Sequence, residues 1–280
     1  MMAFLQHLVD YPFLTRALLT AIFVGAVCGI VGCFILLRGL SLMGDAMSHA
    51  VLPGVAISFI LHIPMFIGAL VTGVLSSLCI GYISDTTKTK KDAAIGIIFT
   101  TFLATGIILI STIQSTTDLY HILFGNILAI TDDAFHTTFW ISLCVIILIL
   151  ILYRPLKIST FDPIFSRMNG LPTRAIHYLV MLLLALVIVT SVQTVGVILV
   201  VALLITPAST AYLLANKLST MLMLSCICSV VSATMGIYFS FQLNLPSGAV
   251  IVLIAALLYV LSFIYNKIKS RFHKGAVHTS

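Results

Sequence analysis

The chain has 280 residues, of which 61% are hydrophobic and only 8% are charged, whereas a soluble domain averages about 25% charged residues. Because a soluble surface needs charged side chains, this composition excludes a soluble globular enzyme and indicates an integral membrane protein. The formal net charge of +6 comes from basic residues that lie between apolar runs and form no basic face, so nucleic acid is not an expected partner.

Missing motifs narrow the function further. The sequence contains no Glu, so it holds no HExxH metalloprotease motif, whose general base is a Glu. It also lacks the Gly-Lys-Ser/Thr of a Walker A loop, and the chain therefore cannot hydrolyse ATP by that route. The six Cys residues fall in apolar runs without a CxxC pair, which is typical of buried Cys that packs as a small hydrophobe.

Apolar runs predict nine membrane-spanning helices, since one span needs about 20 residues. Residues Met1 to Asp10 contain no basic segment and no small-residue cleavage site, so we expect the first span to act as its own insertion signal. The run 175–214 is longer than one span and can divide at Gln193 to Gly196; without that turn the chain has eight spans. The nine expected spans lie near 15–37, 41–61, 65–84, 93–113, 134–153, 175–194, 195–214, 219–240 and 247–265.

The basic residues give an orientation for these spans. If nine spans alternate, every Lys and Arg except Arg16 falls on one side of the membrane. Cytoplasmic loops carry an excess of Lys and Arg, so we expect the N-terminus outside the cell and the C-terminus in the cytoplasm. The spans occupy most of the sequence, so we expect 1–280 to form a single membrane domain without room for a soluble domain of about 100 residues.

Two segments lie outside the expected spans. Residues 119–131 are moderately apolar but too short for a span, and such segments are often re-entrant or interfacial. A gate helix over a pathway on the outer side and a plain interfacial helix both remain open. The basic C-terminal segment 267–280 is expected to be disordered.

Two ionisable residues, Asp45 and His49, lie inside the second expected span, where a charged side chain costs about 2.5–3.5 kcal/mol on insertion. Their spacing of four places both on one helical face, so a carboxylate oxygen and an imidazole nitrogen converge. Such a pair suits a divalent transition metal such as Mn²⁺, Fe²⁺ or Zn²⁺. Two ligands hold a metal weakly, and either a two-fold dimer or bound waters would complete the set.

The residues around this pair allow further interpretations. Pro53 and Gly54 are expected to break the helix within the membrane, and broken helices at that depth usually line a cavity. The acidic and imidazole side chains could instead form an ion pair that holds helices together, or a proton relay. Met43 and Met47 are also four residues apart and could bind Cu(I) as thioethers, although Met in an apolar helix more often packs.

A second group of polar residues lies on the outer side, near the start of the fifth span. Asp132, Asp133 and His136 could attract incoming cations, but their position favours an interpretation as solvated loop residues. Asp118 and His121, together with Asp132, could form an interfacial metal site of a membrane enzyme. Their spacings match no ligand pattern that supports this interpretation.

The loop after the fifth span contains the signals of a short helix at 162–170. Asp162 can cap the N-terminus of a helix, Pro163 suits its first position, and Gly170 suits the left-handed residue after its end. The helix would expose an apolar edge, which indicates either a protein partner or a helix that lies on lipid. That edge consists of Ile164, Phe165 and Met168, with Arg167 beside them.

The run Leu-Met-Gly-Asp-Ala-Met-Ser-His-Ala-Val-Leu-Pro-Gly at 42–54 resembles the signature of the permease subunits of bacterial ABC importers for manganese, zinc and iron. The run from Val195 to Ala208 resembles a second block of that family, and 162–170 resembles its coupling helix. The similarity covers about 15–265, and the first motif is the most specific. The resemblance implies an all-α polytopic membrane protein with the permease fold of the vitamin-B12-importer type.

The resemblance also implies partners and a mechanism. Two copies would pair around a central pathway, a cytoplasmic ATP-binding subunit would dock on 162–170, and an extracellular metal-binding lipoprotein would deliver the ion. Asp45 and His49 match the family's metal-site positions. The metal would be transported cargo, most closely manganese, rather than a permanently bound cofactor. ATP would be hydrolysed on the partner, so this chain itself would not be an enzyme.

A secondary transporter or channel is the alternative, with Asp45 and His49 carrying ions or protons without an ATPase. Such carriers often contain internal inverted repeats, and none is evident in the sequence. The source of energy separates the two hypotheses, because a proton gradient would drive the alternative and ATP would drive an ABC importer.

Overall fold

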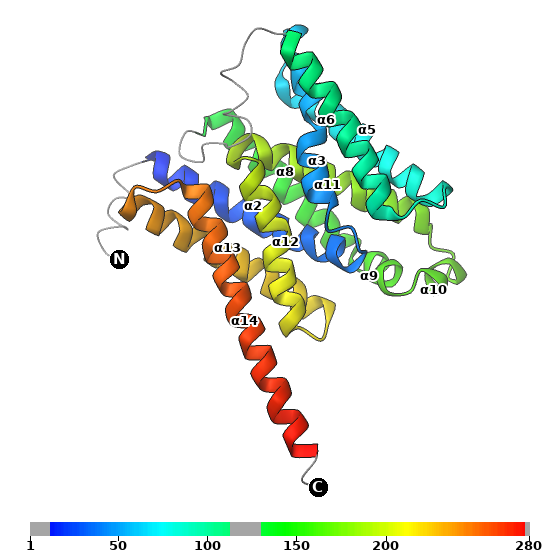
Figure 1. The fold of residues 1–280 in the computed structure, drawn as a ribbon, viewed down its shortest axis with the longest axis vertical. Coiled ribbons are helices and arrows are strands. Elements are labelled where there is room, and N and C mark those ends of the chain that lie inside the picture. Colours follow the sequence, from blue (N-terminus) through cyan, green and yellow to red (C-terminus); the bar gives the residue numbers. More distant parts are fainter. Residues whose placement is uncertain (1–11, 113–129, 278–280) are drawn as a thin grey trace.

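The computed structural model describes residues 12–112 and 130–277, and within these ranges every regular element is a helix (Figure 1). Residues 119–129, which cover most of the expected gate or interfacial helix, lie outside this described part. The helices are α2 (Pro12–Leu37), α3 (Met43–Ala50), α4 (Leu52–Ile60), α5 (Met65–Thr86), α6 (Lys91–Thr112), α8 (Asp132–Ile151), α9 (Tyr153–Phe161), α10 (Pro163–Met168), α11 (Thr173–Val195), α12 (Val197–Leu214), α13 (Leu218–Leu243) and α14 (Ser247–Val277).

The described residues contain nine helical segments that are long and apolar enough to cross a membrane. They coincide with the nine expected spans, and α3 and α4 together form the second of them, Met43–Ile60. The prediction of an all-α membrane protein with nine spans is therefore confirmed.

The second span is interrupted at Val51, two residues before the predicted break at Pro53 and Gly54. Proline has no amide hydrogen for the helical bond to the carbonyl four residues earlier, which here belongs to His49. That carbonyl accepts a hydrogen bond from the Val51 N–H instead. The defect is local, because Val51 keeps a helical backbone with φ −76° and ψ −24°.

Gly54 has a packing role that the sequence did not indicate. A Cβ atom at this position would overlap the backbone carbonyl of Gly68 on α5 and the hydroxyl of Thr72, and a Cβ on Gly68 would overlap the Gly54 carbonyl in turn. Small residues allow membrane helices to approach closely. The Gly54–Gly68 crossing therefore brings α5 directly against the span that carries Asp45 and His49.

The long apolar run 175–214 divides at Gly196, as the sequence predicted. α11 ends at Val195 and α12 begins at Val197, so a single residue joins two spans. Gly196 has φ 85° and ψ 162°, a conformation that residues with a side chain rarely adopt. Glycine is thus what allows the chain to reverse without a loop.

The spans differ in how deeply they are buried. α2, α11 and the α3–α4 span are 67% buried, whereas the α14 span is 11% buried. α14 packs on α12 and α13 and projects from the rest of the molecule (Figure 1). Peripheral helices expose large apolar side chains such as Ile108 on α6 and Leu253 on α14, which suits contact with lipid tails.

The backbone of α14 continues to Val277, so residues 267–277 are helical where the sequence predicted a disordered tail. This segment contains no Pro, and its one Gly is Gly275. Lys and Arg are good helix formers, so the helix can extend past the end of the membrane span at Lys269.

The chain also stays helical after the fifth span. α8 ends at Ile151 and α9 begins at Tyr153, so the segment expected to close the span as a loop starts a new helix. Pro155 is the third residue of α9, where backbone N–H groups have no helical partner in any case. α10 then follows directly after Asp162.

Candidate functional site

Asp45 and His49 lie one helical turn apart on α3. His49 Nε2 lies 3.7 Å from Asp45 Oδ1, and the two side chains are 27% and 56% exposed respectively. The chain therefore does not enclose them. The pair presents an oxygen and a nitrogen ligand to the same space, as the spacing predicted.

That space is a cavity of about 610 Å³ between α3, α12 and α14, which we call the furrow. Ile198 in its wall is 53% exposed, so the furrow opens on the flank of the chain and not into its core. Apart from the pair and one hydroxyl, its lining is apolar. The lining residues are Asp45, His49, Val197, Ile198, Val201, Ala202, Ile205, Thr206 and Val252.

The register against α12 gives the depth of the furrow. α12 has 18 residues and ends just before Lys217, on the side of the membrane that carries the basic loops, which we call the basic side. The residues of α12 that line the furrow all lie between Val197 and Thr206. A Cβ on Gly44 would lie 3.8 Å from Leu204 Cδ1. Asp45, the next residue, is therefore beside the middle of α12, and it belongs to the candidate membrane span Met43–Ile60.

Phe99 on α6 supports the imidazole. The Phe99 and His49 rings lie with centroids 5.6 Å apart at an interplanar angle of 58°. Such aromatic contacts favour particular ring orientations, so α6 helps to position the ligand nitrogen. Phe99 is one of many apolar residues in its span, and nothing in the sequence distinguishes it.

No third His, Cys or Asp joins the pair within residues 12–112 and 130–277. Met43 and Met47 belong to the buried core and do not line the furrow. The Ser76 hydroxyl donates a hydrogen bond of 3.4 Å to Met47 Sδ. The two thioethers thus pack between helices and face away from the pair.

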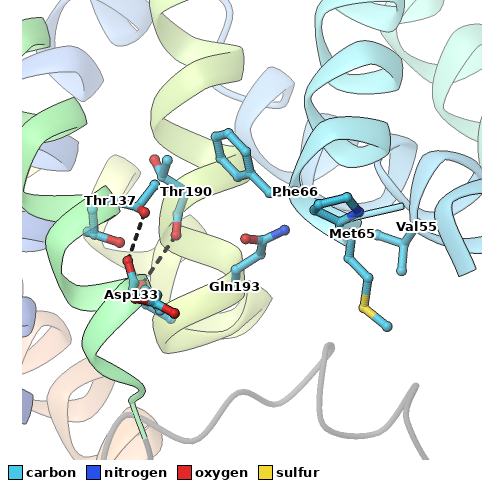
Figure 2. Close-up of a pocket in the computed structure, with 11 residues that line it drawn as sticks. Val55, Met65, Phe66, Asp133, Thr137, Thr190 and Gln193 are labelled. Atoms are coloured by element: carbon cyan, nitrogen blue, oxygen red, sulfur yellow. Dashed lines mark hydrogen bonds between the residues drawn. The ribbon is translucent and has the colours of Figure 1, made fainter. Parts of the chain in front are cut away.

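A second cavity, of about 510 Å³, lies on the membrane side opposite the basic side. Figure 2 shows Asp133 and Thr137 of α8 beside Thr190 of α11, with Gln193 between them and Phe66 of α5. The Thr137 hydroxyl donates to the Asp133 carbonyl at 2.7 Å. The sequence drew attention to Asp133 alone, because Thr190 and Gln193 lie 57 or more residues further along the chain.

Asp132 neutralises the one basic residue that the sequence places on that side. Arg16 Nη1 lies 2.6 Å from Asp132 Oδ1, which explains why a cation is tolerated there against the usual charge asymmetry. Asp132 and His136 do not line the second cavity. Asp118 and His121 lie outside the described residues.

The short helix α10 forms where the sequence predicted it. Asp162 Oδ1 accepts a hydrogen bond of 2.8 Å from the Phe165 N–H, which is the geometry of an N-cap. Gly170 has φ 72° and follows the helix end at Met168. The cap and the glycine together limit α10 to six residues.

α10 exposes the expected apolar edge. Ile164 and Met168 are 73% and 82% exposed, values too high for residues that pack against their own chain. Arg167 Nε donates to the Thr173 hydroxyl at 3.3 Å, so α10 is tied to the start of α11 while its apolar edge is left open.

The chain matches the ABC 3 transport family over residues 10–266, and it belongs to this family. It is thus a permease subunit, the multi-pass membrane component of an ABC transporter, and it resides in the plasma membrane. It is not an enzyme, because ATP hydrolysis in such a transporter belongs to a separate subunit.

Particular relatives are similar over almost their whole length. The manganese transport system membrane protein MntC of Halalkalibacterium halodurans is 50% identical over 276 residues, covering 97% of this chain and 94% of that protein. The chelated iron transport system membrane protein YfeD of Yersinia pestis is 42% identical over 259 residues, covering 92% and 87%. The solved structure of PsaBC from Streptococcus pneumoniae in complex with Fab is similar with a TM-score of 0.84 at 50% identity, covering 94% and 95%.

Proposed function

We propose that this chain is the permease subunit of an ATP-driven importer of divalent transition-metal ions, with Mn²⁺ as its main cargo. The furrow carries the proposal, because it holds a carboxylate and an imidazole ligand in the middle of an apolar wall. These ligands suit Mn²⁺, Fe²⁺ and Zn²⁺ alike, and the names of the relatives favour manganese over iron. The ion is cargo that binds and leaves, and no permanently bound cofactor is required.

A second copy of the chain would complete the site. The furrow opens sideways at mid-membrane depth, and a carboxylate that faced lipid there would cost about 2.5–3.5 kcal/mol. A two-fold copy that covered the furrow would remove Asp45 from lipid and raise the ligand count from two to four. Two-fold pairing uses the same patch on both partners, so one furrow would face the other across the pathway.

Energy and ion delivery would come from other partners. The exposed edge of α10, with Ile164 and Met168, would dock on a cytoplasmic ATP-binding subunit, together with Asp162, Pro163, Phe165, Arg167 and Gly170 of the same segment. The basic side would face the cytoplasm, with the N-terminus outside the bacterial cell. An extracellular metal-binding lipoprotein would then release the ion on the outer side, where the second cavity offers Asp133 and neighbouring hydroxyl oxygens.

Uptake of radioactive manganese in cells tests the site. We expect Asp45→Asn and His49→Gln each to reduce uptake at least about tenfold, because even the groups that only support metal ligands are worth 10–100-fold. Ser48→Ala is the matched control, since its hydroxyl bonds the Gly44 carbonyl of its own helix at 2.9 Å and does not line the furrow. All variants are compared at equal membrane expression, with unlabelled zinc and iron as competitors.

The outcomes distinguish the ion from the energy source. If iron or zinc competes more strongly than manganese, the proposed cargo is wrong but the site assignment stands. Normal uptake in both site variants would show that the pair is structural. Uptake that stops when the proton gradient collapses at constant ATP would contradict an ATP-driven mechanism.

A further inference from the structure

A third cavity, of about 350 Å³, lies on the basic side of the molecule. Its walls come from the end of α2, the end of α5, the start of α6, the α9–α10 junction and the start of α11. We call it the basic cavity, because it is lined by four cations and one acid. The cations are Arg38, Lys91, Arg167 and Arg174, and the acid is Asp85. Residues distant in the sequence thus form a concave surface with an excess of positive charge.

Asp85 is the one carboxylate that lines the basic cavity, against four cations. Arg38, Lys91, Arg167 and Arg174 take part in no salt bridge within the described residues. Arg38 is half-buried, and its guanidinium donates to the hydroxyls of Ser159 at 2.8 Å and Thr160 at 3.2 Å. These bonds use two of its five donors.

Burial lowers the pKa of Arg38 to about 10, so the side chain is still charged at neutral pH. Buried charges are normally paired, but the half-buried Arg38 guanidinium donates to neutral hydroxyls within the described residues and makes no salt bridge with Asp85, the one acid of the cavity. The Lys91 ammonium is held in the same place by a hydrogen bond of 3.3 Å to the Arg38 carbonyl. The fold therefore gathers four cations here against the single carboxylate of Asp85, which leaves an excess of positive charge.

Further donors face the same place. His177 lines the cavity, and its Nε2 atom is buried without a hydrogen-bond partner in the described part of the chain. α11 begins at Thr173 without a side-chain cap. The Thr173 and Ile176 amides donate to backbone carbonyls, which leaves the amides of Arg174 and Ala175 to bind a negative group. The site thus offers guanidinium, ammonium, imidazole and amide donors, which is the chemistry that a multiply charged oxyanion needs.

We infer that the basic cavity binds a phosphate-bearing anion, either the headgroup of an anionic phospholipid or a soluble phosphate. The cavity lies where two membrane spans end, α2 and α5, and two begin, α6 and α11, which is the level of lipid headgroups. Basic pockets between membrane helices on the cytoplasmic side bind anionic headgroups in other proteins. The bound anion would join α10 to α2 and α11 through Arg167, Arg38 and Arg174.

A multiply charged anion suits the excess of positive charge in the cavity better than the single carboxylate of an acidic side chain from a docked protein. Ile164 and Met168, the exposed edge of α10, do not line the cavity. Pro163 and Arg167 of the segment proposed to dock on the ATP-binding subunit do line it, so an experiment must separate the two occupants. The inference does not depend on which ion the permease carries, so it can fail while the proposed function stands.

Native mass spectrometry of the full-length chain in detergent tests the inference. The chain is equilibrated with palmitoyl-oleoyl phosphatidylglycerol or with the matching phosphatidylcholine, and inorganic phosphate binding is measured separately by calorimetry without lipid. We expect phosphatidylglycerol to be retained over phosphatidylcholine. Each Arg near a membrane surface contributes about fivefold in affinity, so Arg38→Gln/Arg174→Gln should reduce retention at least about tenfold.

Two variants separate a binding effect from a folding effect. Lys217→Gln removes an exposed cation from the same side but outside the cavity, and it should retain lipid like the wild type. Arg174→Gln alone is informative because, unlike Arg38, Arg174 makes no hydrogen bond with its guanidinium in the described residues. It should still lose about fivefold at an unchanged thermal midpoint.

The two sources of phosphate give different results. Retention of phosphatidylglycerol that inorganic phosphate does not displace identifies the lipid headgroup, whereas saturable phosphate binding that the double variant abolishes identifies a soluble anion. Equal lipid and phosphate binding by wild type and double variant would overturn the inference. If the double variant instead lost the ATP-binding subunit from the purified complex while its lipid and phosphate binding stayed unchanged, the inference would be overturned in favour of a protein carboxylate.

Discussion

Asp45 and Asp132 are both aspartates, but their surroundings give them different roles. Asp132 pairs with Arg16 at 2.6 Å, with both side chains substantially exposed, and such surface pairs contribute about 0–1 kcal/mol. Asp45 lies beside the middle of α12 with an imidazole at 3.7 Å, so no permanent cation neutralises it. A carboxylate in that position is available to a passing cation.

Gly54 allows a prediction at this scale. Gly54→Ala should lower the thermal midpoint of the purified chain, because the added methyl would overlap the Gly68 carbonyl and overpacking costs about 1–3 kcal/mol. Gly96→Ala on α6 is the matched control, since a Cβ there meets no atom within 4 Å. The midpoint is measured by fluorescence-detected size exclusion after heating. Equal midpoints for the two variants would show that α4 and α5 can separate without cost.

At the scale of single elements, the ends of helices matter most. The second span loses its regular hydrogen bonding at His49, where Pro53 has no N–H to donate. α11 and α12 are joined by one left-handed glycine. α10 exists as a helix of six residues, although isolated helices of that length are unstable in water. Its N-cap, its tie to Thr173 and its attachment to α9 hold it in place.

The N-cap of α10 gives the second prediction. Asp162→Ala should increase hydrogen exchange at the first amides of α10, because loss of an N-cap costs about 0.5–2 kcal/mol. Asp162→Asn should exchange like the wild type, since Asn caps a helix about as well as Asp. Exchange mass spectrometry of the segment 160–170 provides the measurement. Identical exchange in the wild type and the Ala variant would mean that contacts other than the cap hold α10.

At the scale of the whole molecule, the buried spans and the cavities have different roles. α2, α11 and the α3–α4 span form the interior, and they fix where the furrow lies. The three cavities occupy different places: the furrow at mid-depth, the second cavity near the ends of α4 and α11, and the basic cavity at the opposite ends. This arrangement suits a protein that receives an ion on one side and is controlled from the other.

Orientation is a prediction about the whole chain. A single cysteine at Ile63, between α4 and α5, should react with a membrane-impermeant maleimide in intact cells. A cysteine at Lys217, between α12 and α13, should react only after permeabilisation, because the basic side is expected to face the cytoplasm. The native cysteines all lie within spans and serve as the unlabelled background. The reverse labelling pattern would place the N-terminus in the cytoplasm.

The sequence by itself predicted the all-α class, nine spans with eight as the alternative, a division of the run 175–214 between Gln193 and Gly196, and the capped helix α10. These features depend on hydrophobic length, a glycine with no side chain and a cap four residues long, all of which are local in the chain. It also placed Asp45 and His49 on one face of a helix, because the helical period alone decides that.

Only the tertiary structure decided what those residues meet. The wall that α12 forms beside Asp45, the ring of Phe99, the Gly54–Gly68 crossing and the unpaired cations around Arg38 all join segments far apart in the sequence. Periodicity cannot report such contacts, because an apolar residue in a membrane span looks the same whether it faces lipid, a neighbouring helix or the cargo. Helix packing makes that distinction, and it turned a two-residue pattern into a furrow with a defined depth and an open side.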